Sequence, residues 1–463
     1  MFYQASISLA VLYRLLSLII FNAYFMGFLV NILSIPVYLQ LLTLQYVTVI
    51  FILQSFILYQ IAVRPFDRRC TRHDLGFNFE EHETSSTMKE AKIRRIRGLK
   101  RNNENRELPP AFGNGWYMIL ESEELPKGSM KDVFVLGRQL LAVRAHDSRV
   151  YVTNPTCLHM GANFSSGGRV VDNNKIQCPF HGWKWDAASG ALVDIPYSRG
   201  DCHKINAKIA TWPVIERNKH IYLWFHSSGE SPSWEPEKFD KIESGVWRAS
   251  GRSQHEVLCH QQEIPENGAD LAHLNFLHRI GANEGSDIIN SIDLSLENIF
   301  QVTHTWSGEW FSLEDQKHIG VMHLKQYMQF MGWPIPGSDS FLRAEQVGPG
   351  IVHMKFKFAF GEAICLHHVT PIEPLLQKAT FKFYTNINMA FCKFFMYSET
   401  SQFERDVHIW SNKTFIKSPL LAPNDGPINK FRSWFKRQFY CETSPVILPC
   451  GNSSDQPKDL NDF

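Results

Sequence analysis

Cys157-Leu-His159 and Cys178-Pro-Phe-His181 are the two short stretches that decide how the first half of this chain folds. Each stretch presents one thiol and one imidazole, and the Pro and Gly residues beside them indicate tight loops. Two thiolates and two imidazoles in paired loops suit a [2Fe–2S] cluster in which two His replace two Cys on one iron. Such a cluster accepts an electron at a higher potential than an all-Cys cluster.

A zinc site with two Cys and two His is the alternative for the same four side chains. The Cys-x-His spacing is tighter than zinc sites usually have. In addition, His181-Gly-Trp-Lys-Trp-Asp186 is typical of a strand, where a zinc finger would begin a helix. The pattern therefore favours a Rieske-type [2Fe–2S] cluster. Its predicted ligands are Cys157, His159, Cys178 and His181.

A second constellation, Asn267-x-x-Asp270-x-x-His273-x4-His278, follows farther along the chain. On a helix these polar side chains would share one arc of roughly 140°, at about 100° per residue. The two His lie at the edges of that arc, too far apart to hold one ion on an ideal helix. We therefore expect the helix to distort or end between them, with the ion beside the irregularity. The alternative is a pair of hydrogen-bonded core histidines, but a buried Asp270 would need a partner or a metal.

Two His and one carboxylate with open positions suit a non-haem Fe(II) that activates oxygen. The best acid is Asp406, in Gln402-Phe-Glu-Arg-Asp-Val-His-Ile-Trp410, because a helix here places it beside an apolar face. A carboxylate at such a position is costly unless a cation meets it. An Asp paired with an internal Arg or Lys is the alternative, and Glu399 and Glu404 are weaker candidates for the same role.

With these motifs in place, the chain resembles Rieske-type oxygenases, and specifically the Neverland-type cholesterol 7-desaturase family of animals, relatives of bacterial 3-ketosteroid hydroxylases. The resemblance spans roughly residues 110–440. The motifs that carry it are Cys-Pro-Phe-His-Gly-Trp from Cys178, Glu266-Asn-Gly-Ala-Asp-Leu-Ala-His-Leu-Asn-Phe-Leu-His278, and the downstream Gln402, Asp406 and Trp410.

The resemblance implies specific roles for these residues. The mononuclear iron would bind His273, His278 and Asp406, and Asp270 would be a bridge instead of a ligand. In a homotrimer, Asp270 would link His181 of a neighbouring chain to His273. The implied reaction is the conversion of cholesterol to 7-dehydrocholesterol with O2, in steroid hormone biosynthesis.

Electrons for this reaction have to come from outside the chain. The sequence has no flavin or NAD(P) fingerprint and no plant-type ferredoxin Cys spacing. A separate NAD(P)H-dependent reductase is therefore an expected partner.

The overall composition bounds the remaining possibilities. The 463 residues have a net charge of +1, so no global field points to nucleic acid as a partner. The nine Cys are irregularly placed and predict no disulfide framework, as expected for a reducing compartment.

The amino-terminal segment has no Asp, Glu, Lys or Arg from Leu15 to Val63. As one helix it would measure about 74 Å, well beyond a hydrocarbon core of about 30 Å. A transmembrane hairpin with spans at 12–33 and 38–62 is favoured over one span plus an interfacial helix. The Arg residues that follow predict that the soluble part faces the cytosol, and the resemblance suggests the endoplasmic reticulum membrane.

The sequence thus predicts an α+β protein in five parts. These are a membrane anchor over 1–64, a basic linker over 65–110, an all-β Rieske domain over 111–227, a catalytic domain over 228–440 and a disordered tail over 441–463. By the family resemblance, the catalytic domain has a helix-grip (START-like) fold, with a curved antiparallel sheet around a deep cavity. The basic segment 431–439 is expected either to cap this domain or to contact the bilayer.

Rival functions remain open at this point. One is a Rieske monooxygenase that hydroxylates another steroid or a different hydrophobic substrate such as a tetrapyrrole. Another is a non-enzymatic electron carrier or sterol-binding module. The mononuclear iron triad opposes the non-enzymatic alternative.

Overall fold

The computed structural model describes residues 37–80, 82–101, 108–198, 205–280, 288 and 302–446. The chain divides into two compact units, Met1–Arg64 and Pro65–Phe463.

The first unit contains the long apolar helix α2, Val37–Ala62. Its stretch Gln45–Ala62 is long and apolar enough to cross a membrane, and none of that window is buried in the protein. The helix corresponds to the expected span 38–62. The other expected span, 12–33, lies outside the described residues.

In the second unit, three small antiparallel sheets form the Rieske region that follows residue 111. Their strand orders are β10-β5-β4-β3, β11-β12-β2 and β6-β7-β8-β9. One buried core lies between the first two sheets and contains Tyr117, Ala142 and Leu223. A separate core, which includes Trp185, lies under the third sheet. The bounds are β2 Gly115–Glu121, η1 Ser122–Glu124, β3 Ser129–Val135, β4 Arg138–Arg144, β5 Val150–Thr153, β6 Arg169–Val171, β7 Lys175–Gln177, β8 Lys184–Asp186, β9 Leu192–Asp194, β10 Thr211–Trp212, β11 Val214–Arg217 and β12 His220–Phe225.

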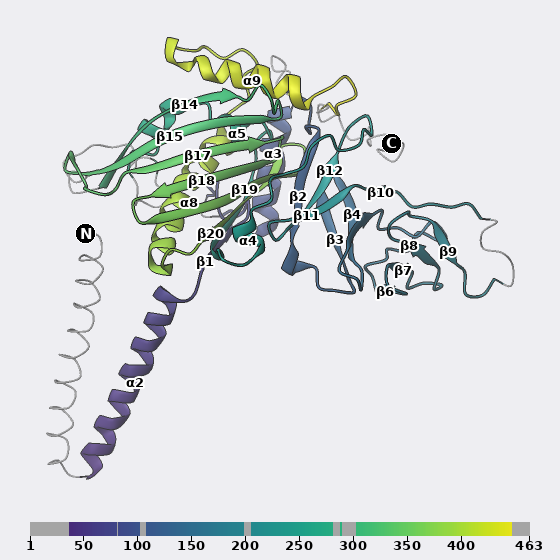
Figure 1. The fold of residues 1–463 in the computed structure, drawn as a ribbon, viewed down its shortest axis with the longest axis horizontal. Helices are drawn as coiled ribbons and strands as arrows, with labels where there is room; N and C mark the ends of the chain where they lie inside the picture. Colours follow the sequence, from purple (N-terminus) through teal and green to yellow (C-terminus); the bar gives the residue numbers. More distant parts are fainter. Residues whose placement is uncertain are drawn as a thin grey trace. The chain divides into compact units, whose positions relative to one another are not determined.

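A nine-stranded sheet dominates the rest of this unit, in the order β1-β13-β20-β19-β18-β17-β15-β14 with β16 paired to β15. All pairs are antiparallel except β1 with β13. Figure 1 shows these strands side by side. The bounds are β1 Phe66–Cys70, β13 Arg248–Val257, β14 Val302–Ser312, β15 Ile319–Phe330, β16 Trp333–Pro334, β17 Ser340–Val347, β18 Ile351–Phe358, β19 Gly361–Glu373 and β20 Leu376–Thr385.

The helix α8, Met389–Asn412, packs lengthwise on this sheet. Its first half contributes Cys392 and Met396 to a core with Phe383, and its second half contributes Val407 and Trp410 to a core with Ala379. The described elements thus agree with the expected helix on a curved antiparallel sheet. The other helices are α3 Ser86–Arg101, α4 Asp240–Glu243, α5 Glu263–Glu266, α6 Leu271–Phe276, η4 Pro423–Asp425 and α9 Gly426–Phe439.

The helix α9 has an apolar face that is buried in the protein. Phe431, Trp434 and Phe435 pack with Trp310 of β14 in one core. Of the two expectations for this segment, the described contacts support capping of the catalytic domain.

Residues 65–110 differ from the basic linker that the sequence suggested. The strand β1 pairs in parallel with β13 from Phe66 to Cys70, so it is an edge strand of the large sheet. The helix α3 buries Ile93 completely, in a core with Leu258 and Leu376. The high density of positive charge concealed this folding, because the few apolar side chains that face inward are separated by Lys and Arg.

A buried ionic cluster connects the Rieske region to the large sheet. Glu121 at the end of β2 forms ion pairs with Lys382 of β20 and with Arg252 of β13, the latter at 2.5 Å. Burial raises the pKa of Glu121, but the two cations outweigh it and hold the pKa at about 2. Glu121 is therefore an ionised carboxylate between two parts of the fold.

Candidate active site with two metal centres

Two loops with the same backbone geometry carry the four predicted cluster ligands. In the first, the Cys157 amide donates to the Ala162 carbonyl at 2.9 Å, and the Gly161 amide donates to the Cys157 carbonyl at 3.0 Å. In the second, the Cys178 amide donates to the Trp183 carbonyl at 2.8 Å, and Gly182 donates to the Cys178 carbonyl at 3.1 Å. Each loop therefore closes with the same pair of bonds. The two glycines have φ of 75° and 73°, in the left-handed region that favours Gly.

The four side chains of these loops converge with the thiols inside and the imidazoles outside. Cys157 and Cys178 are buried, whereas His159 and His181 are half-buried. The two imidazole centroids are 4.6 Å apart, and the His159 ring stacks on Trp183 at 4.4 Å. His181 Nδ1 is buried and has no hydrogen-bond partner among the described residues. This donor set and the unpartnered nitrogen fit a [2Fe–2S] cluster of Rieske type.

Exposed apolar side chains surround the half-buried imidazoles. Leu158, Met160 and Phe180 are adjacent to the ligands in sequence and are more than half exposed, at 56%, 65% and 61%. Apolar residues grouped around a functional group are typical of a contact surface.

The short helix α6 presents the first part of the mononuclear site. Asp270 caps it, because its carboxylate accepts a hydrogen bond from the His273 amide at 3.4 Å. The helix ends at Phe276, and the Leu277 amide still donates to the His273 carbonyl at 2.7 Å. His278 therefore lies just beyond the helix, as the helical wheel predicted. The turn lets both imidazoles face the same point.

Asp406 of α8 meets the two His at that point. His278 Nε2 lies 3.1 Å from Asp406 Oδ1, and the His273 and His278 ring centroids are 5.1 Å apart. The ligand atoms of the three residues all lie within 4.8 Å of one another, as a shared metal ion requires. His278 Nδ1 is buried without a partner among the described residues. The structure thus brings together the three residues predicted as iron ligands, in a donor set that suits Fe(II).

Carboxylates control the charge of His273. Burial lowers the pKa of His273, but the hydrogen bond to Asp270 and the charge of Asp406 outweigh burial and raise it. Burial raises the pKa of Asp270, whereas its interactions with His273 lower it overall. Asp270 therefore orients this imidazole through its Nδ1 atom.

The other acids considered for the metal site have different surroundings. Glu404 forms ion pairs with Arg68 at 2.5 Å and His255 at 3.1 Å, so its charge is already matched. Glu399 lies in the cavity, seven residues before Asp406. The alternative of an Asp406 paired with an internal Arg is not what the structure shows, because its recorded side-chain partner is His278.

One residue that supports the site was missed from sequence. Arg405 is completely buried and donates to the carbonyls of Leu277, at 3.2 Å, and Ile280, at 2.6 Å. It therefore fixes the turn that carries His278 onto α8. An Arg next to the candidate acid was a signal for this, although its partners are backbone atoms that no sequence pattern reveals.

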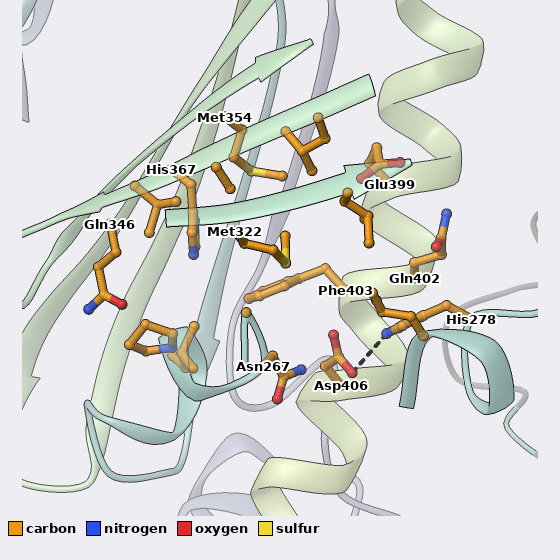
Figure 2. Close-up of a pocket in the computed structure, with 18 of the residues that line it drawn as sticks. Asn267, His278, Met322, Gln346, Met354, His367, Glu399, Gln402, Phe403 and Asp406 are labelled. Atoms are coloured by element: carbon orange, nitrogen blue, oxygen red, sulfur yellow. Dashed lines mark hydrogen bonds and ion pairs between the residues drawn. The ribbon is translucent and has the colours of Figure 1, made fainter. Parts of the chain in front are cut away.

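A large cavity lies beside the triad, between α8 and the concave face of the sheet. It has an empty volume of about 970 Å³, which includes its opening to solvent. Figure 2 shows Met322 and Met354 on the sheet side, and Glu399, Gln402, Phe403 and Asp406 along α8. Its wall is mostly apolar, which suits a hydrophobic substrate with few polar groups.

Two family models match the chain. Residues 115–213 match the Rieske [2Fe-2S] domain, and residues 223–440 match the 3-ketosteroid 9α-hydroxylase C-terminal domain. The first match covers the paired loops and the second covers the triad and the cavity.

A cholesterol 7-desaturase from Caenorhabditis elegans is 46% identical over 426 residues, which is 91% of this chain and 98% of the relative. This chain belongs to the cholesterol 7-desaturase family. The family likeness extends to bacteria: a probable 3-ketosteroid-9-alpha-monooxygenase, oxygenase component, from Rhodococcus rhodochrous is 26% identical over 73% of this chain and 82% of its own length. The expected family is thereby confirmed.

The fold of this chain also matches solved structures. Pseudomonas putida CBB5 NdmA with caffeine superposes with a TM-score of 0.51 at 16% identity, and covers 69% of this chain and 89% of that one. At this level of identity the likeness establishes the fold alone.

Proposed function

We propose that this protein is a membrane-anchored Rieske oxygenase that converts cholesterol to 7-dehydrocholesterol. The observation that carries the proposal is the 46% identity with a cholesterol 7-desaturase over nearly the full length of both chains. The paired Cys/His loops and the His273, His278 and Asp406 triad support the proposal, because they offer donor sets for the two metal centres that such an enzyme needs.

The cofactors are a Rieske [2Fe–2S] cluster and a mononuclear iron, with O2 and NAD(P)H as co-substrates. When bound, the cluster stores single electrons and the iron activates O2 so that hydrogen can be removed from an unactivated carbon. Cys157, Cys178, His159 and His181 would hold the cluster. His273, His278 and Asp406, which line the cavity, would hold the iron.

The side chains around the triad then have three tasks. Asp270 orients the His273 imidazole through Nδ1, and Nε2, which lies 3.3 Å from Asn267 Nδ2, is the nitrogen left for the iron. Arg405 fixes the turn before the second His. The apolar cavity wall would exclude water from the bound sterol and from the metal site.

The electron path between the centres is part of the same proposal. A homotrimer would place the exposed apolar rim around His159 and His181 against the neighbouring subunit, near its Asp270. Asp270 could then connect His181 of one chain to His273 of the next. The rim residues Leu158, Met160 and Phe180 support such a contact surface.

Electrons would enter from a separate reductase, in keeping with the bacterial relative's description as an oxygenase component. The α2 helix would anchor the protein in the endoplasmic reticulum membrane with the catalytic domains in the cytosol, where Arg64, Arg68 and Arg69 follow the apolar stretch.

The test is expression with a reductase and cholesterol, followed by extraction of the sterols. Wild-type protein should yield a 5,7-diene, which has a distinctive ultraviolet absorption, and His273→Ala should yield none. A diene that persists in His273→Ala would contradict the site assignment. A hydroxylated sterol without diene would instead favour the steroid hydroxylation suggested by the 3-ketosteroid 9α-hydroxylase domain match.

A further inference from the structure

Glu399 is a carboxyl group inside the cavity that the proposed chemistry does not use. It lines the main cavity next to the triad and also two adjoining cavities, of about 280 Å³ and 840 Å³ in empty volume. The structure records no hydrogen bond or ion pair for it among the described residues, although it records them for Glu404 on the same helix. Glu399 is therefore a polar group on the cavity wall with no partner in the part of the chain that the structure describes.

The surroundings of Glu399 are mostly apolar. Phe395, Met396 and Phe381 line the same small cavity, and Met354 lies across from it on the sheet. Burial raises the pKa of Glu399 to about 7. Its carboxyl group therefore keeps a proton well above the usual range, and a protonated carboxyl both donates and accepts a hydrogen bond.

Several other polar groups on the cavity wall have at least one partner, whereas the donor-only Trp306 Nε1 is buried without one among the described residues. His367 Nδ1 lies 3.2 Å from the Thr380 carbonyl, and its ring stacks on Phe381 at 3.9 Å. Gln346 donates to the Gly348 carbonyl at 3.2 Å. Glu399 thus differs from His367 and Gln346 in that no partner is recorded for either of its oxygens among the described residues.

The spacing along α8 relates Glu399 to the metal site. Seven residues separate it from Asp406, which is about two turns and a rise of about 10 Å on the same helix face. In cholesterol, four carbon–carbon bonds of about 1.5 Å connect the carbon that bears the hydroxyl to carbon 7, and their zigzag spans roughly 5 Å. A hydrogen bond at one end and the gap to the iron at the other account for the remaining few ångströms.

We propose that Glu399 is the positioning residue that binds the 3β-hydroxyl of the sterol and thereby places carbon 7 beside the iron. The proposal rests on the proposed function and deepens it, because it assigns the one polar group of the substrate to one side chain. The rings of the sterol would lie along Gln402 and Phe403, which line the cavity between the two carboxyl groups of α8.

The test compares two sterols in three proteins. The sterols are cholesterol and cholest-5-ene, which lacks the hydroxyl, and the proteins are the wild type, Glu399→Gln and Glu399→Leu. Equilibrium binding of each radiolabelled sterol is measured together with KM, kcat and the position of the product double bond. Melting temperature and the electron paramagnetic resonance signal of the cluster report whether each variant is folded and loaded.

Removing the hydroxyl should weaken binding to the wild type by about tenfold to a hundredfold, as expected when a buried polar group loses its partner. Glu399→Leu should bind cholesterol as weakly as the wild type binds cholest-5-ene, and should lose the discrimination between the two sterols. Glu399→Gln keeps a donor and an acceptor, and should therefore retain most of the discrimination between the two sterols. The Leu variant should also form products at more than one carbon.

Gln346→Leu is the matched control, because it removes a different polar group from the same cavity wall. It should keep the discrimination for the hydroxyl. Undiminished discrimination in Glu399→Leu, or its loss in Gln346→Leu alone, would overturn the assignment. Wild-type protein that binds both sterols with the hydroxyl preference but makes no 5,7-diene would reject the proposed function while leaving the role of Glu399 intact.

Discussion

The two candidate metal sites are built in opposite ways. The cluster loops place all four ligands within Cys157–His181, and each loop is closed by its own pair of backbone hydrogen bonds. The mononuclear site joins His278 to Asp406 across 128 residues of chain, and Arg405 must also tie the turn beyond α6 to α8. The first site is thus set mainly by local geometry and the second by the packing of the whole sheet. The two should therefore respond differently to mutation.

The largest effect should come from Asp406, the acid of the mononuclear site. Asp406→Asn removes one charge from the triad and should lower diene formation by more than about a hundredfold, beyond the loss typical of residues that only support metal ligands. The cluster signal in electron paramagnetic resonance should stay unchanged.

His408→Gln is the control for that variant, because it alters a half-buried residue on the same helix outside the triad. It should retain diene formation. Loss of the cluster signal in Asp406→Asn would show that the two sites are not independent, and would break the comparison.

The buried ionic cluster tests the dependence on long-range packing. Glu121→Ala would leave Lys382 and Arg252 without their shared carboxylate and should destabilise the protein by about 4 kcal/mol. In increasing urea, mononuclear iron should become available to a chelator before the visible absorption of the cluster fades. If the cluster were lost before the mononuclear iron, the cluster loops would not be held mainly by their own local hydrogen bonds.

The pH dependence of stability tests the apolar environment of Glu399, in the cavity beside the mononuclear site. The pKa of Glu399 is about 7 in the folded protein against an ordinary value of 4.5. Between these values the unfolded chain has released the proton that the folded protein keeps, so this group makes the free energy of unfolding fall as the pH rises, and the loss is complete above pH 7.

Glu399→Gln has no proton to release, so it removes the decrease in the free energy of unfolding that Glu399 causes. Relative to the wild type it should gain stability from about pH 4.5 to pH 7, by on the order of 3 kcal/mol at the upper end. Urea unfolding at pH 5 and pH 8 measures the difference. An equal difference at both values would contradict the burial of this carboxyl in an apolar cavity.

The smallest effects should come from Gly161 and Gly182, the glycines of the two Cys/His loops. Gly161→Ala and Gly182→Ala each force an Ala into the left-handed region and should cost about 1 kcal/mol. The second should cost somewhat more, because a new Cβ would lie 3.2 Å from Pro196 Cγ. Thermal unfolding and cluster content measure both.

Gly229→Ala is the matched control for the loop glycines. Its φ is 73° and a Cβ there meets no atom within 4 Å, but it is far from the cluster in sequence. It should lower the melting temperature to a similar extent and leave cluster content unchanged. If Gly229→Ala also lowered the cluster content, cluster binding would not depend specifically on the glycines of the two loops.

The same contrast explains what could be predicted from the sequence. The cluster residues are close together, so their spacing alone indicated the loops. The end of α6 before His278 followed from helix geometry, and the apolar neighbours of Asp406 indicated its direction. Their roles as ligands stay predictions until a metal is measured.

Other features depend on tertiary partners that no local pattern contains. The strand β1 has the sequence Phe-Asp-Arg-Arg-Cys, which resembles a solvated linker until its pairing with β13 is known. The helix α3 is anchored by Ile93 in a strongly basic segment. Arg405 acts through backbone carbonyls, and its importance became visible only in the folded chain.

A single uninterrupted helix, α8, carries both Asp406 and Glu399. A helix offers only discrete steps of about 1.5 Å along its axis and 100° around it, so a carboxyl can be relocated on the same face only by three, four or seven positions. Regiochemistry in such an enzyme would therefore change in jumps, from one ring carbon to a distant one, and relatives with different products should differ in which turn of this helix bears the acid.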